Sequence, residues 1–126
     1  MKLAYVIPYV ADVPATLAFY KAAFGLETKF MHESGDFGEL KTGGTTLAFS
    51  SRQLMVSLGK NPLEPDPARP VFEIALTTDD VPGALKQALA AGAKLIEEPK
   101  EMPWGQTIAY VSDPDGFVVE LCTPMG

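Results

Sequence analysis

Two stretches of alternating side chains each give way to a helical pattern at the same short sequence. The first stretch ends at Asp-Val-Pro, residues 12–14, and the second at Asp-Val-Pro, residues 80–82. Apolar residues then recur at helical spacing until Gly25 and Gly92. Aspartate is a favourable N-cap, proline fits the first helical turn, and glycine commonly ends a helix. The pattern therefore predicts a strand followed by a helix in both halves of the chain.

Three further strands are expected after each helix, because apolar and β-branched runs alternate there with turn residues. The predicted strands cover approximately residues 25–30, 37–42, 45–50, 92–97, 106–112 and 117–122. Each half is thus predicted to fold as a βαβββ module, the first over residues 1–58 and the second over residues 71–126. Residues 59–70 contain four prolines and are predicted to be a linker. The two modules are each small for an independent domain, so we expect them to form one structural domain with a shared core, or to pair with the halves of a second subunit.

Composition narrows the classes of function. The net charge is −6, which argues against the basic surface that nucleic-acid binding needs and favours neutral or cationic small molecules as ligands. No apolar run is long enough to cross a membrane, and Cys122 is the only cysteine, so we expect a cytoplasmic protein without a disulfide. We expect Cys122 to be an inert apolar residue and His32, the only histidine, to be solvated.

Alternation along the strands places two acids on one face of the second module. Phe72, Ile74 and Leu76 form a fully apolar list that suits the side beneath a helix. Glu73 lies on the opposite face, and Glu120 is assigned to this same face by the alternation of the last strand. We expect the two carboxylates to lie near one another. They can bind a cationic group, hold a metal weakly or act as a general base; alternatively, they reach solvent or bond to neighbouring side chains.

The repeated modules, Ala-Phe-Tyr at 18–20 before Phe-Gly-Leu at 24–26, and Asp-Pro-Asp-Gly-Phe-Val-Val-Glu-Leu at 113–121 resemble the vicinal oxygen chelate superfamily. This superfamily includes glyoxalase I, extradiol dioxygenases, fosfomycin-resistance transferases and bleomycin-resistance proteins. The resemblance covers essentially the whole chain. It implies an α+β fold in which two βαβββ modules form a curled mixed sheet around a shared cavity, and it implies a homodimer.

The resemblance also implies where metal ligands stand in metal-dependent members. Carried over by the motifs, these positions are Tyr5, Ala48, Glu73 and Glu120. The family pattern has His or Gln, then Glu, then His, then Glu, so only Glu120 matches it. We therefore expect no metal and no other cofactor, and any weak metal site would use Glu73 and Glu120.

Aromatic residues complete the set of candidate ligand-binding residues. Trp104, the only tryptophan, is interpreted either as an aromatic ring on which a flat ligand stacks or as part of a subunit interface. Tyr5, Tyr9 and Tyr110 are candidates to line the same cavity, although Tyr9 and Tyr110 also suit ordinary strand packing.

These observations lead to one functional prediction and one alternative. The prediction is a metal-independent protein of the bleomycin-resistance or glyoxalase-like type that sequesters an aromatic or cationic compound, without nucleic-acid or membrane partners. The alternative is an enzyme, a glyoxalase-like metal-dependent lyase or isomerase that uses Glu120 as metal ligand or base. A structural or protein-binding role is the remaining possibility.

Overall fold

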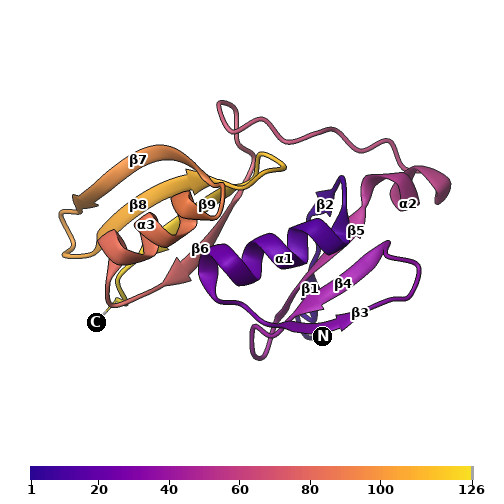
Figure 1. Ribbon diagram of the computed structural model, residues 1–126, viewed down its shortest axis with the longest axis horizontal. Helices are drawn as coiled ribbons and strands as arrows, with labels where there is room; N and C mark the ends of the chain where they lie inside the picture. The colour runs from indigo at the N-terminus through magenta and orange to yellow at the C-terminus, as the bar shows by residue number, and fades with distance from the viewer. Residues whose placement is uncertain (126) are drawn as a thin grey trace. The chain divides into compact units, whose positions relative to one another are not determined.

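The computed structural model describes residues 1–125, and the chain divides into two compact units, Met1–Glu64 and Pro65–Gly126 (Figure 1). The division falls within the proline-rich segment 59–70. Each unit contains one mixed sheet, of five strands in the first unit and four in the second. The α+β fold class with strand–helix–strand–strand–strand order in both halves is therefore confirmed. The cavity shared by the two modules stays a prediction.

The first unit pairs its first strand with its last. Its elements are β1 (Tyr5–Val6), β2 (Tyr9–Val10), α1 (Val13–Phe24), β3 (Thr28–Met31), β4 (Phe37–Leu40), β5 (Thr46–Ser51) and α2 (Arg52–Ser57). The order is β1-β5-β4-β3, and β2 also pairs with β5. The sequence predicts one first strand, whereas the structure has two short pieces separated by Pro8, which lacks a backbone N–H. The parallel register is nevertheless the same on both sides of Pro8, with Tyr5 opposite Thr46 and Tyr9 opposite Ser50.

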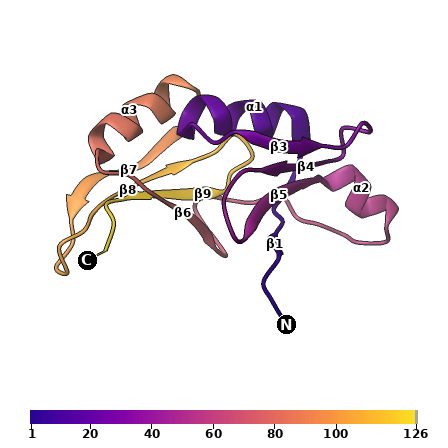
Figure 2. The same ribbon diagram turned by 90° about the horizontal axis from the view of Figure 1, so that it is seen from below.

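The second unit repeats this plan. It contains β6 (Glu73–Thr77), α3 (Val81–Ala90), β7 (Lys94–Glu101), β8 (Thr107–Ser112) and β9 (Val118–Cys122), in the order β6-β9-β8-β7. β6 runs parallel to β9, and the other pairs are antiparallel. α3 covers one face of this sheet, and the described residues of this unit place no helix on the other face (Figure 2).

Both predicted helix starts are confirmed. The Asp12 side chain accepts a hydrogen bond from the Ala15 N–H at 3.0 Å, and Asp80 accepts one from the Gly83 N–H at 3.0 Å. These bonds satisfy N–H groups that a helix leaves without a partner in its first turn. α1 ends at Gly25, whose φ of 70° is a left-handed conformation that glycine adopts without strain.

The turn before β9 is fixed by one buried carboxylate. Asp113 Oδ1 accepts hydrogen bonds from the backbone N–H groups of Asp115, Gly116 and Phe117, at 3.0, 2.9 and 2.9 Å. Asp113 is buried, so these charge-assisted bonds define where the last strand begins. Among the described residues, no helix is long and apolar enough to cross a membrane.

The core of the first unit lies between α1 and the strands β4 and β5. Tyr20 of α1 and Phe49 of β5 are fully buried, and their ring centroids are 5.0 Å apart. Gly38 of β4 faces the same helix. A Cβ atom there would stand 2.6 Å from Leu17 Cδ1 and 3.1 Å from Val13 Cγ1, so α1 packs on a position that has no side chain.

We expect Gly38→Ala to lower the free energy of unfolding by about 1–3 kcal/mol, because the added methyl group overpacks the contact with α1. Urea denaturation monitored by circular dichroism measures this change. Gly44→Ala is the matched control, since its Cβ would meet nothing within 4 Å and its φ is not positive. Equal stability losses in the two variants would contradict the packing argument.

Candidate functional site

The helix-free face of the second sheet brings together Glu73, Tyr110 and Glu120. Glu120 of β9 lies opposite Tyr110 of β8 and opposite Ala75 of β6. Glu73 is two residues before Ala75, so its side chain points to the same face. The strands thus place two acids and one phenol as neighbours, and the expected proximity of Glu73 and Glu120 follows from this register.

Tyr110 and Glu120 are directly bonded. The Tyr110 hydroxyl donates a hydrogen bond to Glu120 Oε1 at 3.0 Å. Burial, this hydrogen bond and the negative charge of Glu120 raise the pKa of Tyr110 to about 12, with smaller contributions from Glu73 and Glu97. Tyr110 is therefore a neutral donor at physiological pH that holds Glu120 in one orientation.

Glu73 is affected by Glu120 as well. The pKa of Glu73 is raised above its ordinary value of 4.5 by burial first, then by a hydrogen bond with Glu120 and by the charge of Glu120. Although Glu73 is exposed as a residue, its carboxyl group is near enough to Glu120 to share that hydrogen bond. Two such carboxylates repel when both are ionised, so the pair favours a proton or another cation between them.

Cys122 follows Glu120 by two residues on the same strand face. It is buried, and its thiol donates to the Leu76 carbonyl at an Sγ–O distance of 3.7 Å. Burial, a hydrogen bond to Glu120 and the charges of Glu120 and Glu73 raise the pKa of the Cys122 thiol. The thiol therefore stays protonated, which suits an unreactive residue.

The first unit presents different residues at the equivalent positions. Tyr5 pairs with Thr46 as Glu73 pairs with Val118, and Glu39 pairs with Ala48 as Tyr110 pairs with Glu120. Ala48 is completely buried and offers no polar atom. Glu39 was not singled out from the sequence, although the alternation of its strand carried the signal.

The other two tyrosines belong to the first unit. Tyr5 is half exposed. The Tyr9 hydroxyl accepts a hydrogen bond from Lys60 Nζ at 3.0 Å, and the same ammonium lies 5.3 Å from the centroid of the Tyr9 ring. Nothing in the sequence pattern pointed to Lys60, which comes from a segment predicted only as linker.

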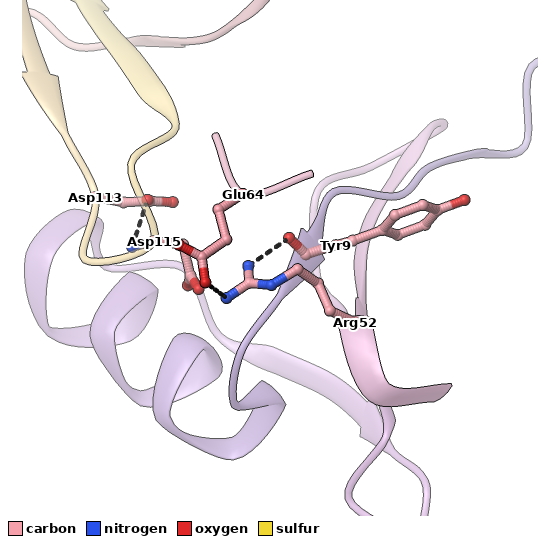
Figure 3. A network of polar contacts seen from close by, with 5 residues as sticks. All are labelled: Tyr9, Arg52, Glu64, Asp113 and Asp115. Atoms are coloured by element: carbon pink, nitrogen blue, oxygen red, sulfur yellow. Dashed lines mark hydrogen bonds and ion pairs between the residues drawn. The ribbon is translucent and has the colours of Figure 1, made fainter. Parts of the chain in front are cut away.

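Arg52 holds the backbone beside Tyr9. Its Nη1 donates to the Tyr9 carbonyl at 3.4 Å, and its Nη2 is 3.6 Å from Glu64 Oε1 (Figure 3). Figure 3 also shows the bond between Asp113 and the Asp115 N–H that belongs to the turn of the second unit. Tyr9 is thus part of a polar network of the first unit rather than a free phenol.

Trp104 lies in the turn between β7 and β8, with 60% of its surface exposed. Its indole Nε1–H donates to Gln106 Oε1 at 2.7 Å. No contact of Trp104 with Glu73 or Glu120 is seen. His32, expected to be solvated, is exposed and shares a hydrogen bond with Ser34.

These residues do not fit the metal that the superfamily resemblance implies. Within residues 1–125, no group of three or more histidine, cysteine, aspartate or glutamate side chains could hold a metal ion. Transition metals in proteins usually need three or four such ligands. Glu73 and Glu120 alone supply two carboxylates, and the equivalent positions of the first unit supply Tyr5 and the apolar Ala48.

The known proteins that this chain resembles in sequence agree with one another in the family that they indicate. The model of the Glyoxalase/Bleomycin resistance protein/Dioxygenase superfamily matches residues 2–121. A Synechocystis protein named probable lactoylglutathione lyase is 30% identical over 131 residues, covering 96% of this chain and 94% of the relative. A lactoylglutathione lyase of Arabidopsis thaliana is 29% identical over 93% of this chain, which spans only 42% of that protein.

Solved structures show the same fold. A glyoxalase-related enzyme from Fulvimarina pelagi superposes with a TM-score of 0.84 at 23% identity, covering 98% of this chain and 88% of that one. A glyoxalase/bleomycin resistance protein/dioxygenase family enzyme from Burkholderia phytofirmans has a TM-score of 0.79 at 25% identity, covering 98% of both chains.

We expect Glu120→Gln to lower the pKa of Glu73 and that of Tyr110 in part, because burial, the largest cause of both shifts, remains while the charge of Glu120 is removed. Carboxyl ¹³C NMR and phenolate absorbance measure the two titrations. Glu98→Gln, which removes one charge from an exposed position of β7, is the control. If Glu120→Gln and Glu98→Gln shift the two titrations equally, the net charge of the protein, and not the proximity of Glu120, raises the two pKa values.

The pair also predicts how stability depends on pH. Because the pKa of Glu73 is higher in the folded than in the unfolded state, the folded state binds this proton more tightly. The stabilisation of the folded state by the protonation of Glu73 is therefore fully present below pH 4.5, and it is lost as the pH rises through the raised pKa of Glu73. Urea midpoints measured across this window should fall less steeply with pH in Glu120→Gln than in the parent.

Proposed function

The chain belongs to the Glyoxalase/Bleomycin resistance protein/Dioxygenase superfamily, and from this premise we propose that it binds and sequesters a small aromatic or cationic compound without a metal. The observation that carries the proposal is the pair formed by Glu73 and Glu120. A positively charged group placed between two carboxylates relieves their repulsion and gains charge-assisted hydrogen bonds.

The surroundings of the pair support a cationic ligand. Tyr110 already donates to Glu120, so one carboxylate is held in place before any ligand arrives. The net charge of −6 attracts cations over distance and disfavours anionic compounds. In this proposal Trp104, which belongs to the same unit as the pair, stacks on a flat part of the ligand.

The donor set disfavours the metal-dependent reaction. A glyoxalase-type isomerisation needs a group that stabilises the developing oxyanion, and in metal-dependent members this is the metal. The described residues contain no group of three or more histidine, cysteine, aspartate or glutamate side chains that could hold a metal ion. Binding without turnover requires only the contacts described above.

A second candidate is an enzyme that moves a proton, a lyase or isomerase. Two observations favour it: three curated relatives are named lactoylglutathione lyase or probable lactoylglutathione lyase, and the pKa of Glu73 is raised. A carboxylate with a raised pKa is a better general base near neutral pH. Here Glu73 or Glu120 takes the proton, and Tyr110 donates a hydrogen bond to the pair.

A cytoplasmic homodimer without nucleic-acid or membrane partners completes the proposal. The resemblance to superfamily members that form dimers supports it, and the single cysteine suits a reducing compartment.

We expect the flat cation 9-aminoacridine to quench the fluorescence of Trp104 on binding, and Glu73→Gln or Glu120→Gln to weaken its affinity about tenfold, because a hydrogen bond to a charged group is lost. Fluorescence titration measures both effects. Glu98→Gln should leave the affinity unchanged. Absence of binding to the parent protein would overturn the sequestration proposal.

The same variants separate the two candidates. If the protein consumes the hemithioacetal of methylglyoxal and glutathione, and Glu73→Gln abolishes this turnover without weakening 9-aminoacridine binding, the enzyme is favoured. If it binds the cation and consumes no hemithioacetal, sequestration stands.

A further inference from the structure

The turn that carries Trp104 is a rigid β-turn with the tryptophan at its third position. The Gly105 N–H donates to the Met102 carbonyl at 2.9 Å, which closes the turn over Pro103 and Trp104. Pro103 at the second position has a φ fixed by its ring. Gly105 has a φ of 101°, a value that residues other than glycine rarely adopt. The backbone therefore presents the Trp104 side chain outward from a turn with little freedom.

A relay of hydrogen bonds then fixes the indole ring. Trp104 Nε1–H donates to Gln106 Oε1 at 2.7 Å, and Gln106 Nε2 donates to the Thr123 carbonyl at 2.8 Å. Thr123 is itself tied to β8, because the Thr107 N–H donates to its hydroxyl at 3.0 Å and its own N–H donates to the Thr107 carbonyl at 3.0 Å. An exposed side chain is thus anchored to the sheet through one glutamine.

The hydrogen bond between Trp104 and Gln106 contributes little to the stability of the folded protein. The indole N–H is at the surface, where water would satisfy it, so the bond to Gln106 adds little net free energy to folding. Its effect is on orientation, because an exposed indole without a partner samples several rotamers. A ring already held in one rotamer loses less entropy when a flat molecule stacks on it.

The relay also places the ring relative to the carboxylate pair. The Met102 N–H donates to the Gln106 carbonyl at 2.7 Å, so Gln106 continues the ladder that precedes β8. By alternation it shares the face of Ile108 and Tyr110, the face without a helix. Tyr110 lies four residues further along, on the order of 13 Å at the usual rise per residue.

We propose that Gln106 is a positioning residue, which holds Trp104 as a preformed stacking surface for an elongated ligand with a flat ring and a positively charged group roughly 13 Å apart. The ring stacks on Trp104 and the charged group reaches Glu73 and Glu120. This inference rests on the proposed function, but it concerns only the ring end of the ligand.

The test uses two probes that report on the two ends separately. Acridone is flat and neutral and should bind only through Trp104, whereas butylammonium is charged without a ring and should bind only through the carboxylates. Gln106→Met removes both hydrogen bonds at similar side-chain volume. Gln106→Glu keeps an acceptor for the indole N–H, and Gln53→Met, the same change at an exposed position of α2, is the matched control.

We expect Gln106→Met to weaken acridone binding about fivefold, to leave butylammonium binding unchanged and to add a fast local component to the fluorescence anisotropy decay of Trp104. Gln106→Glu should restore most of the slow decay, and Gln53→Met should match the parent. Circular dichroism verifies that each variant is folded.

Three outcomes overturn the inference. The first is unchanged acridone affinity in Gln106→Met, the second is an unchanged anisotropy decay, and the third is a change in mass by sedimentation, which would assign the indole to a subunit interface. A parent protein that binds acridone but not butylammonium would contradict the carboxylate site of the proposed function and leave the positioning role of Gln106 intact.

Discussion

The parallel pairing of the first strand with the last strand is the constraint on which the second unit depends. Val119 and Leu121 of β9 are buried on the α3 side of the sheet, so the register is held by their burial. A shift of β9 by one residue would turn these side chains to the helix-free face. It would also place Glu120 beneath α3, where burying an unpaired charge costs free energy. The burial of the apolar face thus fixes where the two carboxylates lie.

The two carboxylates repel each other when both are ionised, and the neighbouring side chains of the sheet compensate this repulsion only in part. Tyr110 donates to Glu120, and the charge of Glu120 in turn raises the pKa of both Tyr110 and Glu73. Phenol and thiol donors can orient a carboxylate, but they bring no positive charge. A proton relieves the remaining repulsion at low pH, and in the proposed function a cationic ligand group relieves it at neutral pH.

Much of this arrangement could be predicted from sequence because it follows from local rules. The Asp12 and Asp80 caps and the shared face of Glu73 and Glu120 need only capping chemistry and the alternation of strands. The bond from Lys60 to Tyr9 could not be predicted, since it joins residues 51 positions apart and no periodicity marks it. The relay through Gln106 was also missed, because its partners become neighbours only when the hairpin between β7 and β8 forms. The short helix α2 has too few turns to show a period.

The two units differ at the positions where their folds agree. The register that pairs Tyr110 with Glu120 in the second unit pairs Glu39 with the buried Ala48 in the first. An acid opposite an alanine has no second charge or phenol to bond across that pair, whereas an acid opposite a tyrosine is oriented and its neighbour Glu73 is perturbed. Equal backbone geometry with unequal side chains therefore places the bonded acid and phenol, and the perturbed Glu73 beside them, in the second sheet. A repeated fold supplies the same scaffold twice, and the chemistry of each copy depends on which side chains occupy four strand positions.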